Sequence, residues 1–218
     1  MKAPADGEAG VTIDVPSGRV IARVRCHAGV VESVTFRNVP AFVVARGVHA
    51  AGVSVDVAYG GAMYASEPAA SFGLRVVPED LAELITAGRE VKLALQDSDV
   101  ARHPTDELLS GIYGTILYEQ VSDLHQRNVT IFADGEVDRS PCGSGTSARC
   151  ALLADDGSLQ AGQVFHHDSI IGTTFTARVV GSTEAGVITE VEGMAYRTGD
   201  HRFTLDPRDP LATGFVLR

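Results

Sequence analysis

The feature that most constrains the fold of this chain is an alternation of apolar and polar side chains, repeated along most of its length. In "RVIARVRC", residues 19–26, apolar residues alternate with arginines. A period of two is typical of a strand with one buried face. Strands are predicted at 11–26, 30–39, 53–59, 111–119, 128–133, 175–181, 187–197 and 201–206.

Only two segments have the longer spacing of a helix. Apolar residues fall near a 3.6-residue period between Leu81 and Leu95, and Pro78 can occupy the first helical position. A shorter helix is predicted from Thr146 to Leu153, with Gly157 as its stop. Residues 1–10 are expected to form a loose leader. The chain is therefore expected to be β-rich, with two helices.

Charge and composition narrow the class of protein. The 218 residues carry a formal net charge of −10, which argues against a nucleic-acid partner. No apolar run approaches the roughly 18 residues of a membrane span, and the N-terminus lacks the apolar core of a secretory signal. Three cysteines suggest neither a disulfide framework nor a metal site, so we expect free thiols in the cytoplasm.

One short stretch, "DRSPCGSGTSARC" at residues 138–150, places a thiol at the mouth of the predicted second helix. The first N–H groups of a helix lack intrahelical partners and carry partial positive charge, so they can hold a small anion such as a carboxylate. The same position is expected to lower the pKa of the Cys142 thiol. A thiol or thiolate there could act as an acid, a base or a nucleophile. A lone cysteine is more often a buried apolar residue, and that reading stays open.

The motif "DRSPCGSGTSAR" closely resembles the second cysteine motif of the proline racemase family, which includes hydroxyproline epimerases. The segments "VESVTFRNVPAFV", "VDVAYGGAMYA", "RNVTIFADGEVDRSPC", "SIIGTTFTARVV" and "LDPRDPLATGF" also resemble the family, in the family's order. The resemblance implies an α/β (α+β) fold like that of diaminopimelate epimerase. In that fold each of two lobes has a curved, mostly antiparallel sheet wrapped around a central helix.

The resemblance also implies a chemistry without a cofactor or a metal. Two cysteines, one from each lobe, flank the α-carbon of proline or hydroxyproline, and one removes a proton while the other delivers one. Cys142 would be one of these acid/base thiols, and the backbone N–H groups of Gly143 and Ser144 would bind the substrate carboxylate. Asp138 would contact the ring nitrogen, and Arg139 would have a structural role through ion pairing.

The family's other cysteine lies in a Met-Cys-Gly-His motif that nothing in this sequence matches. The resemblance therefore predicts a truncated first lobe, represented by residues 11–45 and 201–218, and a complete second lobe over residues 46–200. Missing partners would leave apolar surface exposed and favour a homodimer, or else a separate chain could supply the first lobe.

Other candidate residues are expected to be structural. Cys26 ends an alternating strand, and Cys150 lies two helical turns, about 12 Å, from Cys142. His166 and His167 are adjacent in a predicted strand, so they face opposite sides and do not chelate one metal ion. A hydrogen-bonding role is expected for Asp168.

Three functions remain as alternatives at this point. The chain is a racemase or epimerase of proline-like amino acids, a non-catalytic remnant or ligand-binding lobe, or a relative of trans-3-hydroxyproline dehydratase. In the dehydratase relatives a threonine replaces the second cysteine, so Cys142 favours the first alternative.

Overall fold

The structure is a computed structural model that describes residues 4–212 and 214. Within these residues the chain forms two α-helices, α1 (Leu81–Leu95) and α2 (Gly143–Asp155). The strands are β1 (Gly7–Val15), β2 (Gly18–His27), β3 (Val30–Arg37), β4 (Phe42–Ala50), β5 (Val53–Tyr59), β6 (Met63–Pro68), β7 (Ile112–Ser122), β8 (His125–Phe132), β9 (Glu136–Val137), β10 (Phe165–Ser169), β11 (Thr174–Thr183) and β12 (Gly186–Gly193). The prediction of a β-rich chain with two helices is confirmed.

All the strands belong to one sheet in the order β1-β2-β3-β12-β11-β10-β8-β7-β6-β5-β4, and β9 pairs with β8. Neighbouring strands run antiparallel except for β6 with β7 and β8 with β10. An isolated bridge between Ala41 and Val187 brings the beginning of β4 beside β12. The sheet therefore curls back on itself.

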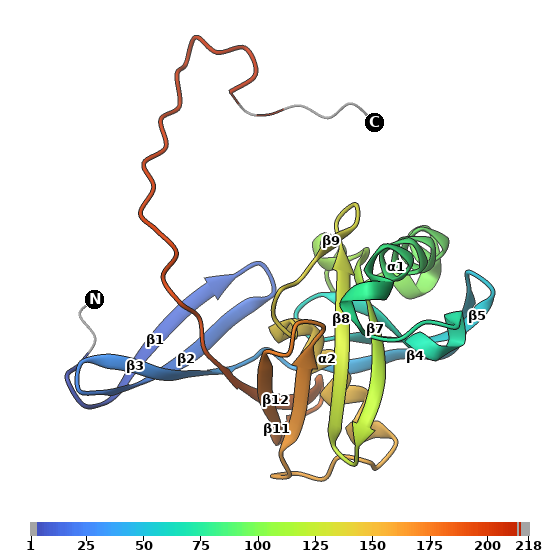
Figure 1. Cartoon of the computed structure of the whole chain (residues 1–218), viewed down its shortest axis with the longest axis horizontal. Helices are drawn as coiled ribbons and strands as arrows, with labels where there is room; N and C mark the ends of the chain where they lie inside the picture. The colour runs from blue at the N-terminus through green and yellow to red at the C-terminus, as the bar shows by residue number, and fades with distance from the viewer. Residues whose placement is uncertain (1–3, 213, 215–218) are drawn as a thin grey trace.

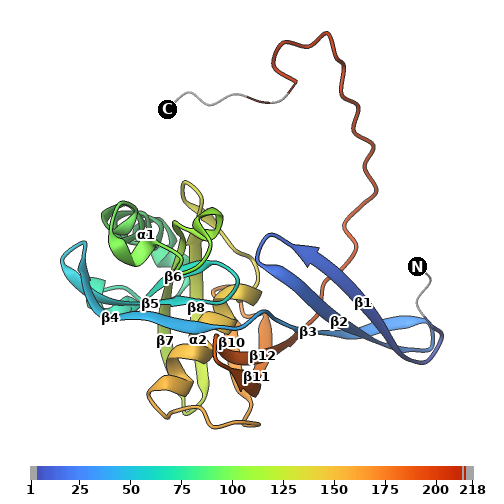
Figure 2. The same cartoon turned by 180° about the vertical axis from the view of Figure 1, so that it is seen from behind.

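The two helices pack on opposite faces of the curled sheet (Figures 1 and 2). Along β5, Val57 packs with residues of α1 while its neighbour Ala58 packs with residues of α2. Helix α2 contacts β4, β5, β6, β11 and β12, which come from both halves of the sheet. Every residue from Gly145 to Leu152 is buried, as expected for a helix enclosed on all sides. The predicted α+β fold, a curved and mostly antiparallel sheet around a central helix, is confirmed.

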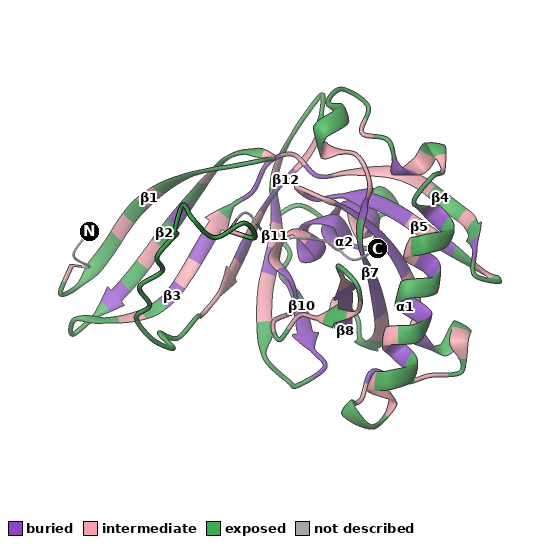
Figure 3. Cartoon of the chain, turned by 90° about the horizontal axis from the view of Figure 1, so that it is seen from above, coloured by how far each residue is buried: buried purple, intermediate pink, exposed green. Residues whose placement is uncertain are grey.

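Strands β1, β2 and β3 project from this body as a ribbon (Figure 1). Residues paired across the sheet share a face, and one such row is apolar from the ribbon to the body. Its members are Val11, Ala22, Phe36, Val191, Ala177 and Phe165. The body end of this row is buried beside α2, whereas the ribbon is mostly exposed or half-buried (Figure 3).

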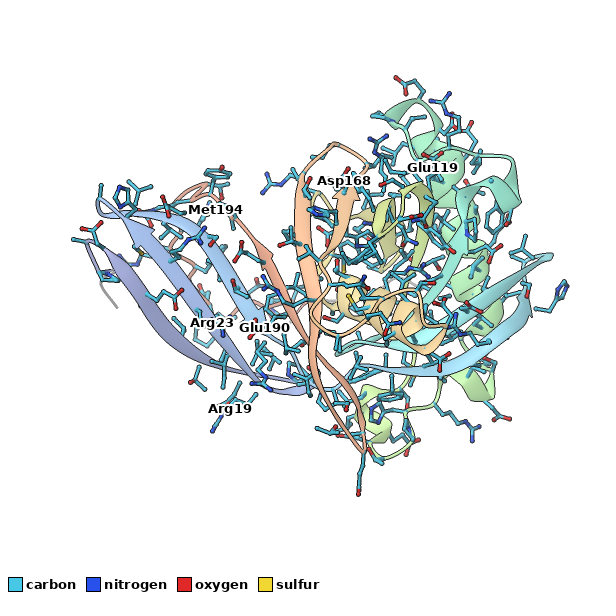
Figure 4. The ribbon with its side chains drawn as sticks, turned by 90° about the horizontal axis from the view of Figure 1, so that it is seen from below. Arg19, Arg23, Glu119, Asp168, Glu190 and Met194 are labelled. Atoms are coloured by element: carbon cyan, nitrogen blue, oxygen red, sulfur yellow. The ribbon has the colours of Figure 1, made fainter. Side chains whose placement is uncertain are left out.

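The opposite face of the ribbon is polar and carries charge pairs. Arg23 on β2 donates two hydrogen bonds to the carboxylate of Glu190 on β12, at 3.0 and 2.9 Å (Figure 4). This paired geometry raises the pKa of Arg23 through the hydrogen bond and the charge of Glu190. The two faces of the ribbon thus differ sharply in chemistry.

The expected leader at 1–10 is wrong in its second half, because β1 begins at Gly7. Residues 7–10 pair with residues 23–26 of β2, so the strand forms through its partner despite two glycines. Residues 1–3 lie outside the described part of the chain.

The strand predicted at 201–206 is also wrong. Residues 194–205 have neither helix nor strand, and the tail runs away from the body (Figure 2). Its alternation is real, but a strand needs a neighbour for its backbone hydrogen bonds, and no described segment pairs with it. Tyr196 and Phe203 are 80% and 90% exposed. Of the predicted first-lobe segment 201–218, residues 213 and 215–218 are not among those described.

Candidate active site

Cys142 lies where the sequence placed it, directly before the first residue of α2. The helix starts at Gly143, three residues earlier than predicted, which makes Cys142 its N-cap. The backbone of Cys142 has φ 68° and ψ 113°, a conformation that residues other than glycine rarely adopt. The strained residue is therefore one that surrounding contacts must hold in place.

Asp138 and Ser140 supply part of that support. An oxygen of Asp138 accepts hydrogen bonds from the backbone N–H and the hydroxyl of Ser140, both at 2.9 Å. The Ser140 hydroxyl in turn accepts from the Cys142 N–H at 3.1 Å. Asp138 thus orders the turn that leads into the thiol, and its half-buried carboxylate is close enough for its charge to raise the pKa of Cys142.

The thiol of Cys142 is enclosed, because the residue is only 7% exposed. Its Sγ lies 3.4 Å from the Tyr64 hydroxyl and 3.9 Å from the Ser144 hydroxyl. Burial raises the pKa of Cys142, while hydrogen bonds from Tyr64, the Gly145 N–H and Ser144 oppose that rise. The expectation of a lowered pKa is therefore wrong, since loss of hydration outweighs the donors at the helix start.

The backbone N–H groups of Gly143 and Ser144 are the first two of α2 and bond to no acceptor in the described residues. Both residues are half-buried, and a Cβ at Gly143 would lie 2.8 Å from the ring of Phe36. The helix start therefore offers two N–H groups without an acceptor among the described residues, beside a thiol.

Thr146 and His167 form a second support of Cys142, which was not predicted from the sequence. The Thr146 hydroxyl donates to the Cys142 carbonyl at 2.7 Å and lies 2.9 Å from His167 Nδ1. His167 is fully buried, and burial, followed by the charge of Arg149, lowers its pKa to about 3. Its Nε2 has no hydrogen-bond partner in the described part of the chain. The neutral His167 ring thus holds the Thr146 hydroxyl in place, and Thr146 holds the carbonyl of Cys142.

Tyr64 is a further residue of the site that was not predicted, although the segment "VDVAYGGAMYA" contains it. Its hydroxyl lies 2.6 Å from the Ser144 hydroxyl. The sequence offered no signal for this contact, because Tyr64 and Ser144 are 80 positions apart.

The remaining candidates are placed as follows. Cys26 and Cys150 are buried, as predicted. His166 is exposed and His167 buried, so the two rings face opposite sides. Asp168 accepts a hydrogen bond from Thr174 at 2.6 Å and lies 2.8 Å from His125 Nε2, which confirms its hydrogen-bonding role. Arg139 is exposed and forms no ion pair with a described residue, contrary to the expectation of pairing.

Among the described residues, no helix combines the length and apolar character needed to cross a membrane. The comparisons with known proteins are consistent over nearly the whole chain. A trans-3-hydroxy-L-proline dehydratase of Bacillus thuringiensis subsp. konkukian is 43% identical over 94% of this chain and 64% of its own length. A 3-hydroxyproline 2-epimerase of Burkholderia multivorans is 41% identical over 97% of this chain and 66% of its own length. This chain therefore spans about two thirds of these relatives.

A solved structure agrees with the sequence comparisons. The structure of a hydroxyproline epimerase from Agrobacterium vitis with bound trans-4-OH-L-proline matches 96% of this chain and 63% of that chain, with a TM-score of 0.86 and 34% identity. The family model described as proline racemase matches residues 1–216. The chain belongs to the proline racemase family.

Proposed function

We propose that this chain carries one acid/base thiol, Cys142, of a cofactor-independent racemase or epimerase that acts on proline or hydroxyproline. The observation that supports the proposal is the position of that thiol. It lies at the start of α2, beside two backbone donors that have no acceptor in the described residues. Relatives named as a hydroxyproline 2-epimerase and a proline racemase support the substrate class.

The proposed substrate position follows from the donors. The substrate carboxylate accepts hydrogen bonds from the N–H groups of Gly143 and Ser144, which the partial positive charge of the helix start strengthens. Asp138 offers its negative charge to the cationic ring nitrogen. Both contacts direct the α-carbon toward Cys142.

The proposed proton transfer uses the thiolate form of Cys142. The thiolate removes the α-proton to form S–H, and the electron pair of the C–H bond stays on the α-carbon, delocalised into the carboxylate. The two N–H groups stabilise the negative charge that this step adds to the carboxylate. Return of a proton to the same face restores the substrate, whereas delivery to the other face inverts it and requires a second acid.

Dehydration is the second candidate function. It is favoured by the 43% identity to a trans-3-hydroxy-L-proline dehydratase, a value close to the 41% found for the epimerase. The two reactions share removal of the α-proton, but dehydration then expels the 3-hydroxyl as water. Cys142, where the dehydratase pattern has threonine, favours return of a proton. A binding lobe without catalysis is the outcome if neither reaction occurs.

The test is exchange of the α-proton for deuterium in D₂O, followed by NMR, with L-proline, trans-4-hydroxy-L-proline and trans-3-hydroxy-L-proline. We expect exchange that Cys142→Ser abolishes and that the matched variant Cys150→Ala retains, because Cys150 is buried on the same helix away from the site. Loss of water from the 3-hydroxy compound would instead identify a dehydratase. Folded protein that exchanges none of the three would contradict the proposed catalysis.

A further inference from the structure

The Tyr64 hydroxyl occupies a position that the proton-transfer step leaves unexplained. Tyr64 is a fully buried residue of β6, and its ring packs in a cluster that includes Ile116, Ala148 and Cys142. Its hydroxyl lies 2.6 Å from Ser144 Oγ and 3.4 Å from Cys142 Sγ. Because the phenol contacts Cys142 and Ser144 from a different element, β6, its hydroxyl does more than fill space in the core.

The hydrogen-bond role of the Tyr64 hydroxyl depends on whether Cys142 is a thiol or a thiolate. Burial, then the charge of Cys142, raises the pKa of Tyr64 far above its usual value, so the phenol keeps its proton and can always donate. When Cys142 is a thiol, the hydrogen bond between its sulfur and the phenol can run in either direction, and so can the bond between the Ser144 hydroxyl and the phenol. When Cys142 is a thiolate, sulfur can only accept, and the phenol O–H is a donor within reach.

Among the described residues, the other donors to this sulfur come from one element. Gly145 and Ser144 both belong to α2, the helix that starts directly after Cys142. Tyr64 is the donor on the sheet, and a hydrogen bond from it fixes the thiol relative to β6 as well as to α2. A hydrogen bond to a charged acceptor is worth more than one between neutral groups, so the contact strengthens when the thiol ionises.

We propose that Tyr64 is a positioning residue that holds Cys142 Sγ against β6 and stabilises its thiolate by donating the phenol hydrogen bond. The inference deepens the proposed function, because a stabilised thiolate is the form that removes the α-proton. Its chemical test does not depend on that function, since thiolate population can be measured without any substrate.

The first experiment is the rate of alkylation of Cys142 by iodoacetamide as a function of pH, followed by peptide mass spectrometry so that Cys26 and Cys150 are counted separately. In Tyr64→Phe we expect alkylation at pH 8 to slow about tenfold and the midpoint of the pH–rate curve to move to higher pH. The matched control is Tyr113→Phe, because Tyr113 lies edge-on to Tyr64 at 5.6 Å and has no hydrogen bond to Cys142. The control should leave the midpoint unchanged.

A Tyr64→Phe midpoint equal to that of the native chain would overturn the proposal. A second measurement on the native chain covers the case in which the variant does not fold. Ionisation of Cys142 should shift the near-ultraviolet tyrosine absorbance to longer wavelength, and Cys142→Ser should lack this shift. An unshifted native spectrum across the thiol titration would equally reject the proposal.

If the chain exchanges the α-proton of a substrate, kinetics can test the role of Tyr64 separately from the proposed catalysis. Tyr64→Phe should lower kcat at pH 8 with little change in KM, and raising the pH should recover part of the loss. Absent exchange in the native chain together with the alkylation effect would remove the proposed function and leave the role of Tyr64 intact.

Discussion

At the residue scale, the backbone of Cys142 adopts a demanding conformation at the residue for which we propose an acid/base role. A positive φ at a residue with a Cβ is unfavourable, and Ser140 and Thr146 hold it from both sides by bonding its N–H and its carbonyl. Strain of this kind persists where the surroundings over-determine the geometry, which is common at functional sites. A residue with a Cβ at this position therefore carries a local conformational cost.

This strain predicts an inverted order of stability for two substitutions of Cys142. Both Cys142→Ala and Cys142→Gly remove the thiol, but only glycine removes the Cβ that opposes φ 68°. We expect Cys142→Gly to be about 1 kcal/mol more stable than Cys142→Ala, the reverse of their usual order within regular structure. Urea unfolding of both variants measures the difference. The prediction fails if alanine is the more stable of the two.

His167 predicts a dependence of stability on pH. Its pKa of about 3 in the folded chain lies below the unfolded value of about 6.5, so the unfolded chain binds the extra proton as the pH falls. The stability linked to this residue is complete above about pH 6.5 and is lost as the pH falls toward 3. Between pH 7 and 5 it accounts for a loss of about 2 kcal/mol.

The measurement is the free energy of unfolding in urea at pH 7 and pH 5. His167→Gln should lose about 2 kcal/mol less over this interval than the native chain, whatever its stability at pH 7. His49→Gln, a change at an exposed histidine, serves as the matched control and should follow the native chain. Equal losses in His167→Gln and the native chain would show that the buried ring is not the group that titrates.

At the element scale, the sequence predicted strands well where a buried face imposes a strict alternation. β5 is predicted at its observed limits, residues 53–59, and α1 ends at Leu95 as expected. β4 was not predicted, because its register shifts twice between Val43 and Val48 and the alternation is lost at Arg46-Gly47. The strand predicted at 201–206 failed for the opposite reason, since the pattern is present and a pairing partner is not.

The residues of the candidate site likewise fall into those that a local sequence pattern predicts and those that only the fold brings together. Cys142, Asp138, Gly143 and Ser144 are close in sequence, so a motif could predict them. Tyr64 contacts the same cysteine from β6, and His167 on β10 acts on it through Thr146; only the curvature of the sheet around α2 brings these strands together. The pKa of the thiol could not be predicted locally, because burial by distant elements dominates it.

Helix α2 packs closely against Gly60 in the turn between β5 and β6, which leads to a prediction. A Cβ there would lie 2.3 Å from the Ser144 carbonyl oxygen and 2.6 Å from the Ala148 backbone nitrogen. Since both atoms are helix backbone, Gly60→Ala must displace α2, and we expect a loss of about 1–3 kcal/mol of stability. Substrate exchange at Cys142 should fall with it.

The matched control for Gly60 is Gly181→Ala in β11, where a Cβ meets open space. That change should alter the unfolding free energy by less than about 0.5 kcal/mol. Thermal and urea unfolding of both variants test the comparison. If Gly60→Ala is as stable as Gly181→Ala, the turn does not set the position of the helix.

At the scale of the whole molecule, the ribbon of β1–β3 continues an apolar face that α2 covers only in the body. The row from Phe165 to Val11 crosses six strands, and its outer part has no helix over it in the described residues. An uncovered apolar face of this kind favours association. The lobe boundaries expected from the family resemblance, 11–45 with 201–218 and 46–200, stay a prediction.

We therefore predict that the chain self-associates through the apolar face of the ribbon. Ile13 lies on this face, paired with Val20, whereas Ile21 lies on the polar face, paired with Thr12 and Arg37. The two side chains are similarly exposed, at 43% and 49%, so they form a matched pair. Ile13→Lys should shift the chain toward monomer because it buries a charge in the contact, while Ile21→Lys should leave association unchanged. Sedimentation velocity over a range of protein concentrations measures both. A native chain that stays monomeric throughout, or equal effects of the two lysines, would show that this face is not where copies meet.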